Sequence, residues 1–166
     1  MDVAFVALPI ETRGLELLPF QTDQRVAALP ADHPCADRSE IGIEDLADDP
    51  VIVQGGATSE WNAFHNVDPR PDGSRPRPGP VANNFQEKLE LVAAGAAVSF
   101  LPESVARHYI PPGVAYVPVR GIPPIEICIA WKPERSSPLV DGFIRAVRSS
   151  GPTSSTRGPR SALTAR

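Results

Sequence analysis

The chain has 166 residues, a formal net charge of −4 and an isoelectric point near 5.4. This length suits one domain of ordinary size, and so acidic a chain lacks the basic surface that nucleic-acid binding requires. No run of roughly 18 apolar residues occurs, and no basic segment precedes the apolar stretch after Met1. We therefore expect a cytoplasmic protein without a membrane span or an export signal.

The first third of the chain predicts short strands. Val3–Leu8 is apolar at every position, which is typical of a strand covered on both faces in a parallel sheet, and Pro9 ends it. The other elements expected in this part are strands at Leu15–Phe20, Arg25–Leu29 and Val51–Val53, and one helical turn at Glu44–Ala47.

Residues 54–80 are predicted to form a long loop. Gly, Pro, Arg and Asp dominate there and leave no periodicity, apart from a possible helix around Ser59–Phe64. Trp61 is assigned to core packing in preference to stacking on a ligand. A solvated loop is favoured over a nucleic-acid contact for the three arginines of this segment, Arg70, Arg75 and Arg77, which are interleaved with aspartates.

The most informative segment begins at Asn84. Asn84 is a good helix N-cap, and Glu87 follows three residues later, as in a capping box. Gly95 supplies the left-handed turn that ends a helix. The short apolar run Val98–Leu101 then predicts a buried strand, which Pro102 ends.

The last third predicts alternating helices and strands. The expected elements are a helix at Glu103–His108, strands at Val114–Val119 and Ile125–Trp131, and an amphipathic helix at Leu139–Val147. Cys128 lies inside an apolar strand, where a buried thiol is the ordinary interpretation. Residues 150–166 contain little that could be buried, so we predict a disordered tail.

The block that begins at Asn84, together with Asp2–Leu8 and Ile125–Trp131, resembles the effector-binding domain of LysR-type transcriptional regulators. The family's sequence motif is valine-alanine-alanine-glycine, followed by a second glycine two positions later and by an apolar run that ends in leucine-proline. The resemblance extends in the right order over about residues 2 to 148. Its further matches are Ala27–Pro34, Glu44–Pro50 and Pro138–Phe143.

The chain also departs from the family pattern. Ala97 stands where members usually have the second glycine, and Ala7 stands where many members have an arginine that faces the ligand. The winged helix-turn-helix, the linker helix and the opening part of the first lobe have no counterpart here. By this resemblance, DNA would be reached only through a missing winged helix-turn-helix.

The alternation of strands and helices predicts an α/β fold, and the resemblance implies the two-lobed fold of type 2 periplasmic-binding proteins. The expected domain covers residues 1–149. Residues 1–26 and 125–149 would form an incomplete first lobe, and residues 27–124 a complete second lobe. The strand at Val3–Leu8 would then lack neighbours, and the chain would be marginally stable or would self-associate.

The resemblance implies that a small-molecule effector binds between the lobes. In open α/β sheets ligands bind at the carboxyl ends of the strands, and six residues are nominated on this basis. They are Leu8, Pro9, Gln54, Gly55, Asn83 and Asn84. The helix that begins after Asn84 directs its N-terminus at the same crevice, which favours an anionic effector.

No residue set predicts a catalytic constellation, a metal site or a cofactor site. Three alternatives to an effector-sensing domain stay open. The first is a solute-binding protein, which would need an export signal, and the second is an enzyme on the same fold, of the prephenate dehydratase sort. The third is a free-standing remnant that dimerises with related regulators, beside the homo-oligomer that we otherwise expect.

Overall fold

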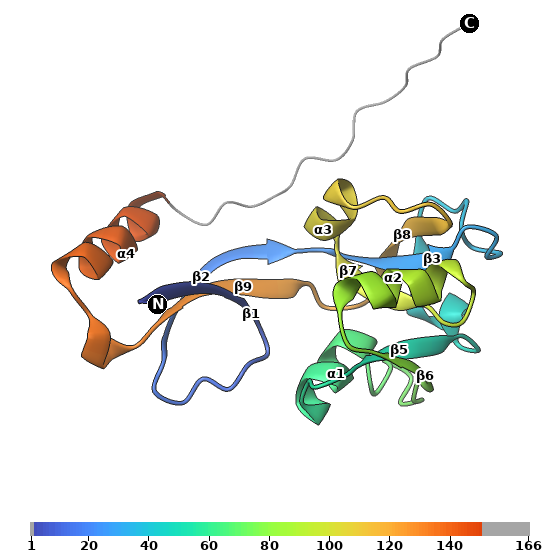
Figure 1. Ribbon diagram of the computed structural model, residues 1–166, viewed down its shortest axis with the longest axis horizontal. Coiled ribbons are helices and arrows are strands. Elements are labelled where there is room, and N and C mark those ends of the chain that lie inside the picture. The colour runs from blue at the N-terminus through green and yellow to red at the C-terminus, as the bar shows by residue number, and fades with distance from the viewer. Residues whose placement is uncertain (1, 151–166) are drawn as a thin grey trace, which may run out of the picture.

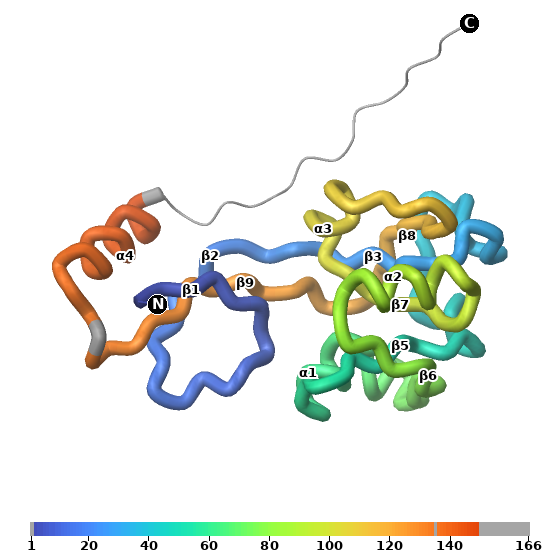
Figure 2. The backbone as a smooth tube through the Cα atoms, in the orientation of Figure 1, coloured from blue at the N-terminus to red at the C-terminus, as the bar shows by residue number. Residues whose placement is uncertain are grey.

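The structure is a computed structural model that describes residues 2–150 (Figure 1). Two lobes are visible, and the chain passes between them twice (Figure 2). No helix in the described range is long and apolar enough to cross a membrane. In chain order the elements are β1 (Val3–Ala7), β2 (Glu16–Asp23), β3 (Arg25–Pro30), β4 (Ile41–Gly42), the 3₁₀ helix η1 (Ile43–Leu46), β5 (Pro50–Gln54), α1 (Ser59–Asn66), β6 (Arg77–Ala82), α2 (Phe85–Ala93), β7 (Ser99–Pro102), α3 (Glu103–His108), β8 (Val114–Arg120), β9 (Ile125–Trp131), the 3₁₀ helix η2 (Pro133–Arg135) and α4 (Pro138–Ser150).

Lobe 1 is a three-stranded antiparallel sheet with the order β1-β9-β2. The helix α4 packs on this sheet, where Val140 and Ile144 form a small core with Ile129. The predicted amphipathic helix is therefore confirmed, and it begins one residue earlier than its apolar periodicity indicates. The predicted disordered tail, apart from Ser150 at the end of α4, lies outside the described residues.

The strand β1 differs from the sequence prediction. It pairs antiparallel with β9 and, within the described part of the chain, with no other strand. Phe5 in its middle is 58% exposed, so the prediction of a parallel strand covered on both faces is wrong. A uniformly apolar run indicates a strand, but it does not tell a central strand from an edge strand with one covered face.

Lobe 2 contains a sheet of order β4-β8-β3-β7, which the parallel pair β5-β6 extends through one bridge between β5 and the residue before β7. Alternate residues of β3 supply two cores. Ala27 and Leu29 pack with residues of η1 on one face, whereas Val26 and Ala28 pack with α2 and α3 on the other. The central strand β3 is buried along its whole length.

The strand β6 corrects the prediction that residues 54–80 form a loop. It pairs in parallel with β5, and it begins at Arg77, inside the predicted loop. Pro78 and Pro80 hide it from sequence inspection, because proline lacks the N–H that a central strand needs. Both prolines are tolerated because β6 is an edge strand of the described sheet.

The helix α2 begins as the sequence predicts. The side chain of Asn84 accepts the N–H of Glu87 at 2.9 Å. The carboxylate of Glu87 accepts the N–H of Asn83 at 2.8 Å, one residue before the position expected in a capping box. Gly95 ends the helix with φ of +73°.

Candidate functional site

A cavity of about 430 Å³ lies between the two lobes. Lobe 1 contributes the loop that follows β1, and lobe 2 contributes the start of α1. The lining residues are Pro9, Ile10 and Glu11 from lobe 1, and Gly56, Ala57, Thr58, Glu60 and Trp61 from lobe 2. A largely apolar cleft between two lobes, with a few polar groups, is the usual form of a small-molecule site.

The start of α1 is held at this cavity by a network at the end of β5. Asn62 accepts the N–H of Gln54 at 2.9 Å and donates to its carbonyl at 3.1 Å. Thr58 caps the helix by accepting the N–H of Trp61 at 3.1 Å. The free N–H groups of the first helical turn therefore lie beside the cavity and give it a partial positive charge.

Trp61, His65 and Lys88 form a cluster next to the cavity wall. The rings of Trp61 and His65 stack with centroids 3.6 Å apart, and the Lys88 ammonium lies 5.7 Å from the Trp61 centroid. Burial lowers the pKa of His65 to about 4, against a smaller opposing effect of its hydrogen bond to the Trp61 carbonyl. His65 is therefore neutral at pH 7. Desolvation also lowers the pKa of Lys88.

The chain passes between the lobes in two crossover segments, one between β2 and β3 and the other between β8 and β9. Arg25 connects α1 to both of them. It is 3% exposed, and its Nε donates to the carbonyl of Pro123 in the second crossover at 2.8 Å. Its Nη1 donates to the carbonyls of Phe64 at 3.0 Å and His65 at 3.4 Å, near the C-terminal end of α1. Burial lowers its pKa to about 10, so the guanidinium stays charged at pH 7. Asp23, in the first crossover, accepts the backbone N–H and the hydroxyl of Ser104 in α3.

The structure places the six nominated site residues in three groups. Pro9 lines the cavity, and Leu8 beside it donates its N–H to the carbonyl of Glu126 at 2.9 Å. Gln54, Gly55 and Asn83 lie together at the carboxyl ends of β5 and β6. A Cβ added to Gly55 would lie 2.5 Å from Asn83 Oδ1.

Asn84 is exposed and caps α2, so its side-chain oxygen already accepts a hydrogen bond from the N–H of Glu87. Of the six nominated residues, Pro9 alone lines the inter-lobe cavity.

The sequence interpretation did not single out Arg25 or Lys88. Arg25 precedes a fully apolar run and Lys88 precedes Leu89 on the inner face of α2. A cation at the start of a buried strand, or on the apolar face of a helix, is the signal that could have drawn attention to them. Trp61 was assigned to the core, whereas the structure places it among the residues that line the cavity.

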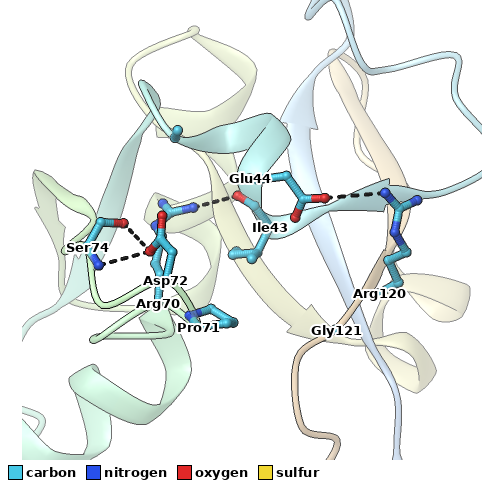
Figure 3. A pocket seen from close by; sticks show the side chains of 9 residues that line it. Ile43, Glu44, Arg70, Pro71, Asp72, Ser74, Arg120 and Gly121 are labelled. Atoms are coloured by element: carbon cyan, nitrogen blue, oxygen red, sulfur yellow. Dashed lines mark hydrogen bonds and ion pairs between the residues drawn. The ribbon is translucent and has the colours of Figure 1, made fainter.

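A second cavity, of about 320 Å³, lies within lobe 2 (Figure 3). Arg120 donates to Glu44 at 3.3 Å, and Asp72 accepts the Ser74 hydroxyl at 2.7 Å, whereas Nε and Nη2 of Arg70 are buried without a hydrogen-bond partner among the described residues. Arg70 is 4% exposed and donates to the carbonyl of Ile43 at 2.6 Å, so the prediction of a solvated loop is wrong for this arginine. No residue of lobe 1 lines this cavity.

Comparison with known families identifies the two-lobed fold. The profile of the family described as LysR substrate binding domain matches residues 1–152. The chain belongs to this family. The sequence resemblance and the two-lobed α/β fold that it implies are therefore confirmed for this LysR domain.

Its curated relatives are transcriptional regulators. The HTH-type transcriptional regulator AlsR of Bacillus subtilis (strain 168) is 30% identical over 149 residues, which cover 87% of this chain and 48% of the relative. The Hca operon transcriptional activator HcaR of Escherichia coli (strain K12) is 27% identical over 157 residues, which cover 89% of this chain and 50% of the relative. The LysR domain thus spans about half the length of these relatives.

Solved structures share the fold. The BenM effector-binding domain with its effector benzoate superposes with a TM-score of 0.72 at 21% identity, and the match covers 90% of this chain and 68% of that chain. The reduced form of OxyR superposes with a TM-score of 0.68 at 23% identity, with 90% and 69% covered.

Proposed function

We propose that this LysR domain binds a small organic effector in the inter-lobe cavity and conveys the binding to a DNA-binding domain. The observation that carries the proposal is that both lobes line one cavity, at the loop 9–11 and at the start of α1. A ligand that contacts both lobes favours one relative arrangement of them by its differential affinity. Arg25 links α1 to the crossovers, so a change at the cavity reaches the segments that join the lobes.

Filling the cavity tests this proposal. A library of small organic molecules is screened by thermal shift, and the compounds that stabilise the protein are titrated calorimetrically into wild type and Ala57→Trp. The indole of this variant occupies the cavity, so the affinity is expected to fall at least about tenfold. Ala31→Trp, at an exposed turn after β3, is the matched control and should bind like wild type.

Two results would count against the proposal. One is that compounds bind Ala57→Trp as tightly as wild type, and the other is that no compound in a broad library stabilises the wild type. A ligand at 100 times its Kd stabilises the folded state by about 2.7 kcal/mol, which a thermal shift detects readily.

A binding role, and not catalysis, is proposed for the cavity, since its lining offers no nucleophile paired with a base. The relatives are regulators of transcription, and this supports a cytoplasmic location for the whole protein, where bacterial DNA is accessible.

The proposed partner of lobe 1 is a second copy of this chain. One edge of β1 pairs with no strand of the described residues; it is apolar and lies next to exposed side chains of α4, with Phe5 58%, Leu139 84% and Phe143 40% exposed. These side chains line a groove of about 470 Å³. An apolar strand edge without proline or charge is a template for pairing with another strand.

Phe5→Lys is therefore expected to shift the chain toward monomer in sedimentation velocity across a concentration series. Val81→Lys is the control, because Val81 is 54% exposed on β6, an edge strand of lobe 2 in which Pro78 and Pro80 already prevent pairing. Monomeric wild type at high concentration, or equal effects of the two variants, would contradict the proposal.

A further inference from the structure

We infer that lobe 2 holds a second ligand site, in which Arg70 binds the carboxylate of a small organic molecule through the Nε and Nη2 edge of its guanidinium. The site is the cavity of about 320 Å³ that Ile43, Pro71 and Gly121 help to line (Figure 3). Among the described residues, this cavity shares no lining residue with the inter-lobe cavity. The inferred site therefore goes beyond the proposed function.

Arg70 is a buried cation whose donors are only partly used. It is 4% exposed and lines the cavity, and its Nη1 donates to the carbonyl of Ile43 at 2.6 Å. Within the described part of the chain, Nε and Nη2 have no hydrogen-bond partner and no carboxylate forms an ion pair with Arg70. Burial lowers the pKa of Arg70, and the attraction of Asp72 and Asp49 opposes this effect only in part. Since a buried donor without an acceptor is costly, an anion that supplies two acceptors would stabilise the site.

The two free nitrogens of Arg70 are the pair that a carboxylate fits. In a guanidinium, the N–H of Nε and one N–H of Nη2 lie parallel on the same edge, and this edge matches the two oxygens of a carboxylate. The hydrogen bond to the Ile43 carbonyl uses Nη1, so it holds the group in place and leaves this edge unoccupied (Figure 3). A planar anion is therefore the complementary ligand.

The turn at residues 71–74 follows Arg70 and lines the same cavity. Its residues are exposed, and its own hydrogen bonds hold it together. The N–H of Gly73 donates to the carbonyl of Arg70 at 2.9 Å, and the N–H of Ser74 donates to Asp72 at 2.9 Å. Nε and Nη2 are buried in this structure, so a ligand in the cavity reaches them when this turn shifts.

The other groups of the cavity favour a ligand with one negative charge and an apolar body. The apolar side chains that line it are Ile43, Ala47 and Pro71. Two exposed carboxylates, those of Glu44 and Asp72, also line it. They would repel a dianion such as phosphate more strongly than a monocarboxylate. The inferred ligand class is therefore the small organic monocarboxylates.

An NMR titration of backbone amides follows the two cavities separately. Cyclohexanecarboxylate, the neutral cyclohexanecarboxamide and inorganic phosphate are each added at constant ionic strength and neutral pH. The signal of Gly121 reports on the lobe 2 cavity, and the signal of Gly56 reports on the inter-lobe cavity. In wild type, the carboxylate is expected to shift the Gly121 signal saturably, with a higher affinity than the amide or phosphate.

Two variants and two controls locate the binding. Arg70→Lys keeps the charge but lacks the planar fork, so the carboxylate affinity measured at Gly121 should fall about tenfold or more. Ala47→Trp fills the cavity from an exposed position and leaves Arg70 unchanged, and it should weaken binding by a similar factor. The controls are Arg75→Met, whose side chain is 82% exposed in the same segment, and Ala31→Trp. Both should bind like wild type.

Thermal unfolding without ligand identifies a variant that is unfolded, and Ala47→Trp still tests the inference if Arg70→Lys is unstable. No saturable shift of Gly121, equal carboxylate affinity in wild type and Ala47→Trp, or tighter binding of the amide or phosphate would each overturn the inference. A Gly121 response that persists in Ala57→Trp supports it, because that variant fills only the inter-lobe cavity. A carboxylate response confined to Gly56 and abolished by Ala57→Trp would overturn this inference and leave the proposed function standing.

Discussion

Replacing Arg25 by alanine is expected to lower the free energy of unfolding by about 3 kcal/mol. Arg25 is 3% exposed, and its guanidinium donates to three carbonyls and lies 4.5 Å from the centroid of the Phe64 ring. Hydrogen bonds from a charged donor contribute roughly 1.5 to 3 kcal/mol each, and the substitution leaves buried acceptors without donors. The substitution also removes the cost of desolvating the charge, and this offsets part of the loss. We therefore expect the free energy of unfolding to fall by less than the summed contributions of the three hydrogen bonds.

Denaturant unfolding of Arg25→Ala, Arg25→Lys and the exposed control Arg13→Ala measures this effect. Arg25→Lys keeps the charge but lacks the planar fork, so it should restore only part of the stability. Hydrogen exchange should also rise in α1 and in residues 121–124, which Arg25 holds together. A loss below about 1 kcal/mol would show that desolvation nearly cancels the hydrogen bonds of Arg25.

Replacing Ile144 by aspartate is expected to cost about 4 kcal/mol, or to detach α4 from the sheet of lobe 1. Ile144 is 7% exposed and packs in a cluster whose other fully buried members are Ile129 and Val140. So small a core cannot repack around a carboxylate. The two clusters of lobe 2 are larger, so lobe 2 should keep its structure.

Hydrogen exchange resolved by segment is the measurement. Protection should fall in α4, β1 and β9 and stay unchanged in β3 and β7. Arg145→Asp is the control on the same helix, since Arg145 is exposed and lies outside the proposed self-association groove, and the change should cost less than about 0.5 kcal/mol. Equal loss of protection in both lobes would mean that they unfold as one cooperative unit.

Part of the candidate site follows from the sequence. Pro9 was nominated because it ends a strand, and it lines the cavity, since strand ends on one edge of a fold meet in one cleft. Asn83 and Gly55 do lie together, for the same reason, but outside the cavity lining. The helix α1 begins at Ser59, where the sequence predicts a possible helix, but Thr58 at its N-cap was not nominated for the site, because the segment around it has little periodicity.

Local signals in the sequence determine most of the elements of this domain. The cap at Asn84, the left-handed Gly95 and the apolar strands act over a few residues, and the structure confirms them. Only the tertiary structure decides which strand lies at an edge, as with β1 and β6, and which charges are buried, as with Arg25 and Lys88. The reason is physical. Burial and partners depend on segments distant in the chain, such as Arg25 and Pro123, and no short window of sequence contains both.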